Sequence, residues 1–183
     1  MLQSKKICVI TMIVAFCIGS NYALISIPNF KFMDFLIFIS GFVFGSLVGA
    51  SIGILAWLVY GVLNPYGFVP QIWLATMFSE SVYGFAGGII SRWITPTNIT
   101  GNRIGLSFLF GATGFFSTFL YDLITNVVFA LTFDIPIFIA IITSVPFTIN
   151  HELGNTALFG VCSIPLITAL EKFIGGEGFG VRK

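Results

Sequence analysis

The chain has 183 residues, of which 57% are hydrophobic and only 8% are charged, and its formal net charge is +1. A soluble domain carries roughly 25% charged residues, so this composition excludes a water-soluble globular protein and predicts an integral membrane protein. The small net charge also argues against a nucleic-acid-binding surface. At about 20 apolar residues per helical span, the length predicts a single all-α transmembrane domain over residues 1–183.

The first predicted span covers residues 7–27 and follows Lys5 and Lys6. A secretory signal peptide begins in the same way, but its apolar core is only about 7–15 residues long. Because the apolar run continues to residue 27, we expect an uncleaved transmembrane helix. The three cysteines of the chain lie inside apolar runs, and we interpret them as small hydrophobic residues, not as a disulfide or metal site. They are Cys8, Cys17 and Cys162.

The next apolar stretch, residues 34–63, fits one over-long helix or two short ones, and Lys31 and Asp34 mark a polar loop before it. Cytoplasmic loops carry an excess of lysine and arginine. If the N-terminus is cytoplasmic and the stretch divides near residues 49–51, only Lys31 falls outside. The other basic residues then all lie on the cytoplasmic side: Lys5, Lys6, Arg92, Arg103, Lys172, Arg182 and Lys183. We therefore predict two short helices.

Three further spans are predicted after a turn at residues 64–67, namely residues 70–93, 104–133 and 137–173. Pro146 and Pro165 are expected to bend or interrupt the last span, although membrane helices tolerate proline. Residues 175–180 are predicted to form a polar, glycine-rich tail. The sequence thus predicts a multi-pass protein of the plasma membrane with six transmembrane helices and both termini in the cytoplasm.

Small residues recur every four positions in two places, which puts them on one helix face and lets a neighbouring backbone approach closely. The first set is Ala15, Gly19 and Ala23, and the second is Gly41, Gly45, Gly49 and Gly53. We expect the glycine set to pack inside the protein. For the set in the first span two interpretations stay open, internal packing and docking to a separate membrane subunit.

Several polar side chains are predicted near the middle of the bilayer, on the last three long spans. A charge at that depth costs roughly 2.5–3.5 kcal/mol on insertion scales, so these groups must be paired, neutralised or turned to a wet cavity. Helical spacing of three or four residues pairs them on common faces. The pairs are Glu80 with Tyr83, Asp122 with Asn126, and His151 with Asn155.

Two interpretations of these polar faces stay open. They converge on a ligand pocket, or they form a hydrogen-bond network that holds helices together, for example between His151 and Asp122. Aromatic residues gather toward the outer half of the chain and suit an interfacial belt, and some of them suit stacking on a flat ring that enters from outside. They are Trp57, Tyr60, Tyr66, Phe68 and Trp73.

Catalytic motifs are sparse. The sequence has no phosphate-binding loop of the form G-x-x-x-x-G-K-[ST], so ATP hydrolysis by that route is excluded. His151 and Asn155 match the H-x-x-x-N of intramembrane prenyl-protein-type proteases, but those enzymes also need paired glutamates followed by arginine, which Glu80-Ser81 does not supply. We do not expect an enzyme. An intramembrane protease and a structural or channel-like protein remain as alternatives.

The layout resembles the substrate-binding S-component of energy-coupling factor vitamin transporters. The resemblance covers the whole chain and rests on its length, its six predicted spans and a set of dispersed positions. These are Ala15-x-x-x-Gly19-x-x-x-Ala23, Met33-Asp34 through Gly41, Phe44, Gly45 and Gly49, Trp57, Tyr60-Gly61, Asn64-Pro65-x-Gly67, Glu80-x-x-Tyr83-Gly84 and Gly87-Gly88. Glycine stands at the middle of the first motif, where the family has alanine.

The resemblance implies a protein that captures a vitamin or cofactor precursor, such as riboflavin, thiamine or a cobalamin, without a covalently bound cofactor. The face of the first span would dock on a transmembrane coupling subunit, which two cytoplasmic ATPase subunits drive. Substrate would bind near the outer side, under a loop at residues 29–34 and the turn at residues 64–67. The candidate binding residues are Trp57, Asn64, Glu80, Tyr83, Asp122, Asn126, His151 and Asn155.

Overall fold

The computed structural model describes residues 3–65, 67–94 and 101–173, and within these ranges the chain is all-helical, without a strand. Its helices are α1 (Gln3–Ala23), α2 (Phe32–Phe44), α3 (Ser46–Leu63), α4 (Pro70–Ile90), α6 (Arg103–Thr132) and α7 (Ile137–Phe173). The all-α prediction is therefore confirmed. Tyr66 of the predicted aromatic belt and the predicted tail at residues 175–180 lie outside the described residues.

Three of these helices are long and apolar enough to cross a membrane, namely Ser46–Leu63, Arg103–Thr132 and Ile137–Leu170. Two shorter apolar helices cover Ile7–Ala23 and Phe32–Phe44. The exterior agrees with this composition, because large hydrophobic side chains such as Phe108 and Phe138 are more than 70% exposed. A surface of this kind suits lipid and not water.

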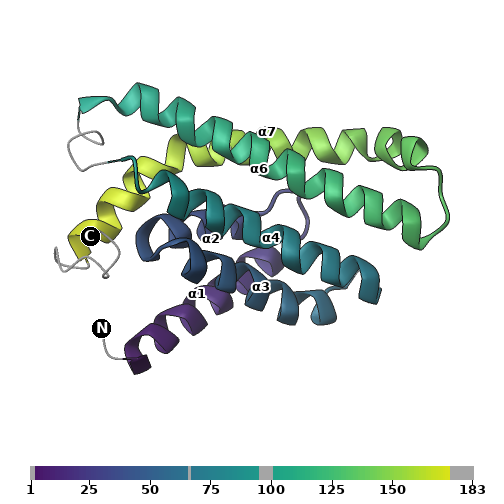
Figure 1. The fold of residues 1–183 in the computed structure, drawn as a ribbon, viewed down its shortest axis with the longest axis horizontal. Coiled ribbons are helices and arrows are strands. Elements are labelled where there is room, and N and C mark those ends of the chain that lie inside the picture. Colours follow the sequence, from purple (N-terminus) through teal and green to yellow (C-terminus); the bar gives the residue numbers. More distant parts are fainter. Residues whose placement is uncertain (1–2, 66, 95–100, 174–183) are drawn as a thin grey trace.

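The helices form a bundle in which α4 is central. It packs against α2 and α3 on one side and α6 on the other, and α6 forms a long hairpin with α7. Figure 1 shows the start of α1, the junction of α2 with α3 and the end of α7 at the same end of the bundle. The loops after α1, α3 and α6 lie toward the opposite end. The chain therefore runs up and down the bundle axis with each successive helix.

The 34–63 stretch is divided into two helices as predicted, but the predicted position of the break is wrong. The break lies at Gly45 and not at residues 49–51. Gly45 has φ 97° and ψ 158°, a backbone conformation open essentially to glycine alone. The residue after it, Ser46, lies against α4, where a Cβ added to Gly88 would come within 2.2 Å of the Ser46 nitrogen. The break between α2 and α3 therefore lies at a close contact with α4.

Gly45→Ala is expected to lower the free energy of unfolding by about 1–3 kcal/mol, because alanine is strained at this φ and ψ. The measurement is the midpoint of thermal denaturation of the purified protein in detergent. Gly19→Ala is the matched control, since Gly19 is helical and an added Cβ there meets nothing within 4 Å. Equal midpoints for the two variants would contradict the assignment of the break.

The glycines of α2 and α3 pack inside the protein, as predicted, and their neighbours are glycines of α4. A Cβ on Gly41 would lie 2.0 Å from the Gly84 carbonyl oxygen, and one on Gly84 would lie 2.2 Å from the Gly49 carbonyl carbon. A Cβ on Gly87 would lie 2.0 Å from the carbonyl oxygen of Phe38. These three helices therefore touch backbone to backbone, which only glycine permits at such distances.

The small-residue face of α1 behaves differently. Ala15, Gly19 and Ala23 are all exposed, and nothing lies within 4 Å of a Cβ built on Gly19. The interpretation that this face packs internally is therefore wrong. Around it the side chains of Met12 and Phe16 are 67% and 69% exposed, so α1 presents an open apolar surface.

The first predicted span ends earlier in the structure than predicted, whereas the last span has the predicted bounds. The first helix ends at Ala23 and not at residue 27, because residues 24–29 form turns, with the Ile27 amide donating to the Leu24 carbonyl. The last helix covers Ile137–Phe173 as predicted and keeps both prolines inside it. Figure 1 shows it changing direction toward its C-terminal, yellow part, as expected of a proline-containing helix.

Candidate functional site

A cluster of buried polar side chains lies where α2, α4, α6 and α7 meet. We call it the polar cluster, and it consists of Asp34, Glu80, Tyr83, Thr118, Asp122, His151 and Asn155. None of these residues is more than 7% exposed. Buried polar groups are costly unless they are hydrogen-bonded, so the partners of each one determine what the cluster can do.

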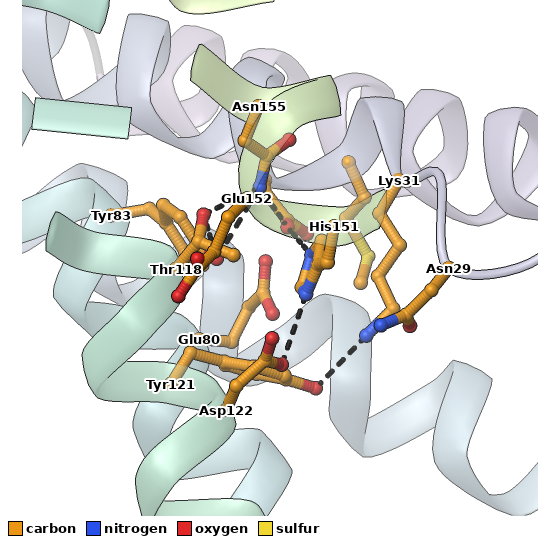
Figure 2. Close-up of polar contacts among 12 residues, drawn as sticks. Asn29, Lys31, Glu80, Tyr83, Thr118, Tyr121, Asp122, His151, Glu152 and Asn155 are labelled. Carbon is orange, nitrogen blue, oxygen red and sulfur yellow. Dashed lines mark hydrogen bonds and ion pairs between the residues drawn. The ribbon is translucent and has the colours of Figure 1, made fainter. Parts of the chain in front are cut away.

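His151 is held between two carboxyl groups. Its Nε2 lies 2.7 Å from Asp34 Oδ2 and its Nδ1 lies 3.0 Å from Asp122 Oδ1. Figure 2 shows the ring between α7, which carries it, and the Asp122 side chain. Two short contacts to carboxylates are the arrangement that suits a doubly protonated ring, which donates from both nitrogens. The imidazole is thereby fixed in orientation and links three helices.

Asn155 extends this network by one helical turn. Its amide nitrogen donates to Asp34 Oδ2 at 2.8 Å and to Thr118 Oγ1 at 2.8 Å. The Tyr83 hydroxyl donates to the same Thr118 oxygen at 3.0 Å. The predicted pairing of His151 with Asp122 is therefore confirmed, and it belongs to a hydrogen-bond network that links α2, α4, α6 and α7.

The carboxyl groups nevertheless keep acceptor capacity that the described protein atoms do not use. Trp57 Nε1 donates to Glu80 Oε2 at 2.8 Å. Yet Asp34 Oδ1, Glu80 Oε1 and Asp122 Oδ2 are buried without a hydrogen-bond donor. Such orphaned oxygens are rare in native proteins and call for a physical reason.

Lys31 lies at the end of the loop that follows α1 and contacts two aromatic residues beside the polar cluster. Its ammonium nitrogen lies 3.3 Å from the Tyr121 hydroxyl, and it sits over two aromatic rings. The distances to the ring centroids are 4.6 Å for Tyr121 and 5.3 Å for Trp57. Both distances are within the range of a cation–π interaction. Figure 2 shows Lys31 reaching from the loop side toward Tyr121 and the cluster.

A cavity of about 420 Å³ adjoins Lys31 on the loop side. It mixes apolar walls with a few polar groups, as small-molecule sites do. Its lining consists of Asn21, Leu24, Ile25, Ile27, Pro28, Asn29, Phe30, Lys31, Tyr60 and Phe147. The loop is fastened to α7, because Asn29 Nδ2 donates to the Phe147 carbonyl at 2.9 Å and Asn150 donates to the Pro28 carbonyl.

Six of the eight predicted binding residues come together here. Glu80, Tyr83, Asp122, His151 and Asn155 belong to the polar cluster, and Trp57 is bonded to it. The other two do not join it. Asn64 bonds within its own turn, to the Gly61 and Gly67 carbonyl oxygens, and Asn126 lies half-buried one turn beyond Asp122 without a hydrogen bond to the cluster's described residues.

Asp34, predicted at the border between a polar loop and the 34–63 stretch, was not among the predicted binding residues. It is in the first turn of α2 and fully buried. The signal was present, because Asp34, Phe38 and Gly41 are spaced by four and three residues and so share one helix face. Thr118, Tyr121 and Lys31 were also missed, and of these only Thr118, four residues before Asp122, had a comparable signal.

Comparison with known proteins does not extend this picture. No family model, no curated protein and no solved structure matches the chain. Over the part of the chain that the structure describes, no group of three or more histidine, cysteine or acidic side chains is arranged to hold a metal ion.

Proposed function

We propose that the chain is the substrate-capturing membrane subunit of an importer of the energy-coupling factor type, and that its ligand is a small, vitamin-like molecule. Six helices cross the plasma membrane in this proposal, with both termini in the cytoplasm. ATP is hydrolysed in two separate subunits, since this chain lacks a phosphate-binding loop.

The up-and-down course of the helices supports the six crossings. The start of α1 and the end of α7 lie at one end of the bundle, and the loop between α1 and α2 lies toward the other (Figure 1). If the termini are cytoplasmic, this loop and the cavity under it face outward. The two short helices, α2 and α3, cross by tilting or by local thinning of the bilayer.

The observation that carries the proposal is the cavity next to Lys31. Its volume of about 420 Å³ falls within the range of roughly 300–1,000 Å³ that is typical of small-molecule sites. It lies beneath a loop of the proposed outward end, and Lys31, one of its lining residues, also donates to the Tyr121 hydroxyl beside the polar cluster. Apolar walls that carry a few polar side chains, among them Asn21, Asn29 and Lys31, suit a water-soluble molecule with a ring.

The open face of α1 supports a partner subunit. Ala15, Gly19 and Ala23 are exposed along one side of the helix, and small residues in this spacing allow close approach by a second transmembrane helix. The transmembrane coupling subunit is the partner proposed for this face. An intramembrane protease gains no support, because both ring nitrogens of His151 are already bonded to carboxyl groups.

Mass spectrometry of the protein purified in mild detergent tests the proposal. We expect a small, water-soluble molecule to be retained in stoichiometric amount and to be lost from Tyr60→Leu, which removes an aromatic wall of the cavity. Phe116→Leu is the matched control, because Phe116 is 67% exposed on α6. If the wild-type protein retains nothing and none of riboflavin, thiamine and cobalamin raises its thermal midpoint, the proposed function is wrong.

A further inference from the structure

The charges around the polar cluster do not balance. Asp34, Glu80 and Asp122 contribute three carboxyl groups, and the basic groups that face them within the described ranges are Lys31 and, when doubly protonated, His151. One negative charge is therefore in excess. A positively charged ligand bound beside these carboxyl groups would neutralise it.

The unpaired oxygens of these acidic residues also favour a ligand that donates hydrogen bonds. The buried orphaned atoms of the three acidic residues are all acceptors: Asp34 Oδ1, Glu80 Oε1 and Asp122 Oδ2. Asp34 and Glu80 are both 0% exposed, so bulk water does not serve them. In Figure 2 the Glu80 carboxyl points into the space between Thr118 and His151, above the Tyr121 ring. A ligand that satisfies these oxygens must bring hydrogen-bond donors.

The walls beside Glu80 also favour positive charge. Trp57 and Tyr121 present their ring faces to the Lys31 ammonium at 5.3 and 4.6 Å, and the face of an aromatic ring attracts cations. Trp57 additionally donates its N–H to Glu80, so one aromatic wall and one carboxyl group form a single unit. Lys31 belongs to the loop that lines the cavity, so its ammonium shows where a cation is accepted.

From these observations we propose that the ligand of this site is an organic cation with nitrogen-bound hydrogens, such as a protonated amine, an amidine or a charged heteroaromatic ring. Its charged nitrogen lies against Glu80 and the rings of Trp57 and Tyr121, and takes the place of the Lys31 ammonium. This inference rests on the proposed function and names the substrate class of the same site.

The test uses three probes of one shape and different charge: benzamidine, which is cationic, benzamide, which is neutral, and benzoate. Binding to the full chain in detergent is measured by the shift of the thermal midpoint with probe concentration, at constant ionic strength. We expect benzamidine alone to stabilise the protein. Equal stabilisation by benzamide, stronger stabilisation by benzoate, or no effect of benzamidine would each overturn the inference.

Two variants with opposite expected effects sharpen the test. Glu80→Gln keeps an acceptor for Trp57 but removes the charge, and we expect it to weaken benzamidine binding about tenfold. Lys31→Met removes the competing ammonium, and we expect it to strengthen binding by a similar factor, about tenfold. Lys172→Met is the control for net charge, because Lys172 is exposed in the last turn of α7.

The charge of the retained molecule and the variant results together separate this inference from the proposed function. A retained molecule that proves neutral or anionic leaves an uptake subunit in place but overturns the cationic ligand. Unchanged benzamidine affinity in both Glu80→Gln and Lys31→Met would also overturn the inference, because the charged group of the probe would then bind away from these two residues.

Discussion

Gly84→Leu is expected to abolish folding, and it is the substitution with the largest effect that we anticipate in the bundle. A Cβ at this position would lie 2.2 Å from the Gly49 carbonyl carbon and 2.3 Å from the Ala50 nitrogen. Both are backbone atoms, so no side-chain rotation relieves the clash, and α4 would have to move away from α3. The cost should exceed about 4–5 kcal/mol, which is exceptional for a single substitution.

The measurement is the yield of monodisperse protein in size-exclusion chromatography after membrane extraction. Gly19→Leu is the matched control, since it introduces the same side chain into a helix where nothing lies within 4 Å of the added Cβ. We expect the control to elute like the wild type and Gly84→Leu to aggregate or fail to accumulate. A well-folded Gly84→Leu would mean that α3 and α4 are not in backbone contact.

Much of the helical layout was predictable because local chemistry decides it. Pro70 begins α4, where its missing N–H is not needed, and the last helix follows directly from the length of its apolar run. The break at Gly45 was not predictable in the same way. Several glycines of residues 41–53 can adopt a positive φ, and the packing of Ser46 against Gly88 is a long-range contact that no local pattern encodes.

The site was predictable where energetic cost singles out a residue. Glu80, Asp122 and His151 stand out because charged or titratable groups within an apolar span must find partners. Asp34 does not stand out, because it follows Lys31 at the edge of a span and reads as part of a loop. It is buried against α7, where it bonds to His151 and Asn155, and sequence separations of 117 and 121 residues hide those contacts.

Asp34→Ala is expected to have the largest effect among the polar residues. Asp34 Oδ2 accepts from both His151 Nε2 and Asn155 Nδ2, so its removal leaves an imidazole nitrogen and an amide unpaired in the interior. Removing one partner of a buried ionic pair typically costs about 3–5 kcal/mol. The thermal midpoint in detergent measures this loss, and Asn126→Ala, which leaves the described contacts of the cluster in place, should change the midpoint little.

A double substitution distinguishes an orphaned partner from a mere loss of packing. In Asp34→Ala with His151→Leu the imidazole that Asp34 served is gone, so the combined loss of stability should be clearly smaller than the sum of the two single losses. Residues in one hydrogen-bond network couple by about 0.5–3 kcal/mol, whereas independent sites add. Strict additivity, or a single Asp34→Ala variant as stable as Asn126→Ala, would show that His151 does not depend on Asp34. The polar cluster would then lack the carboxyl group that joins α2 to α7.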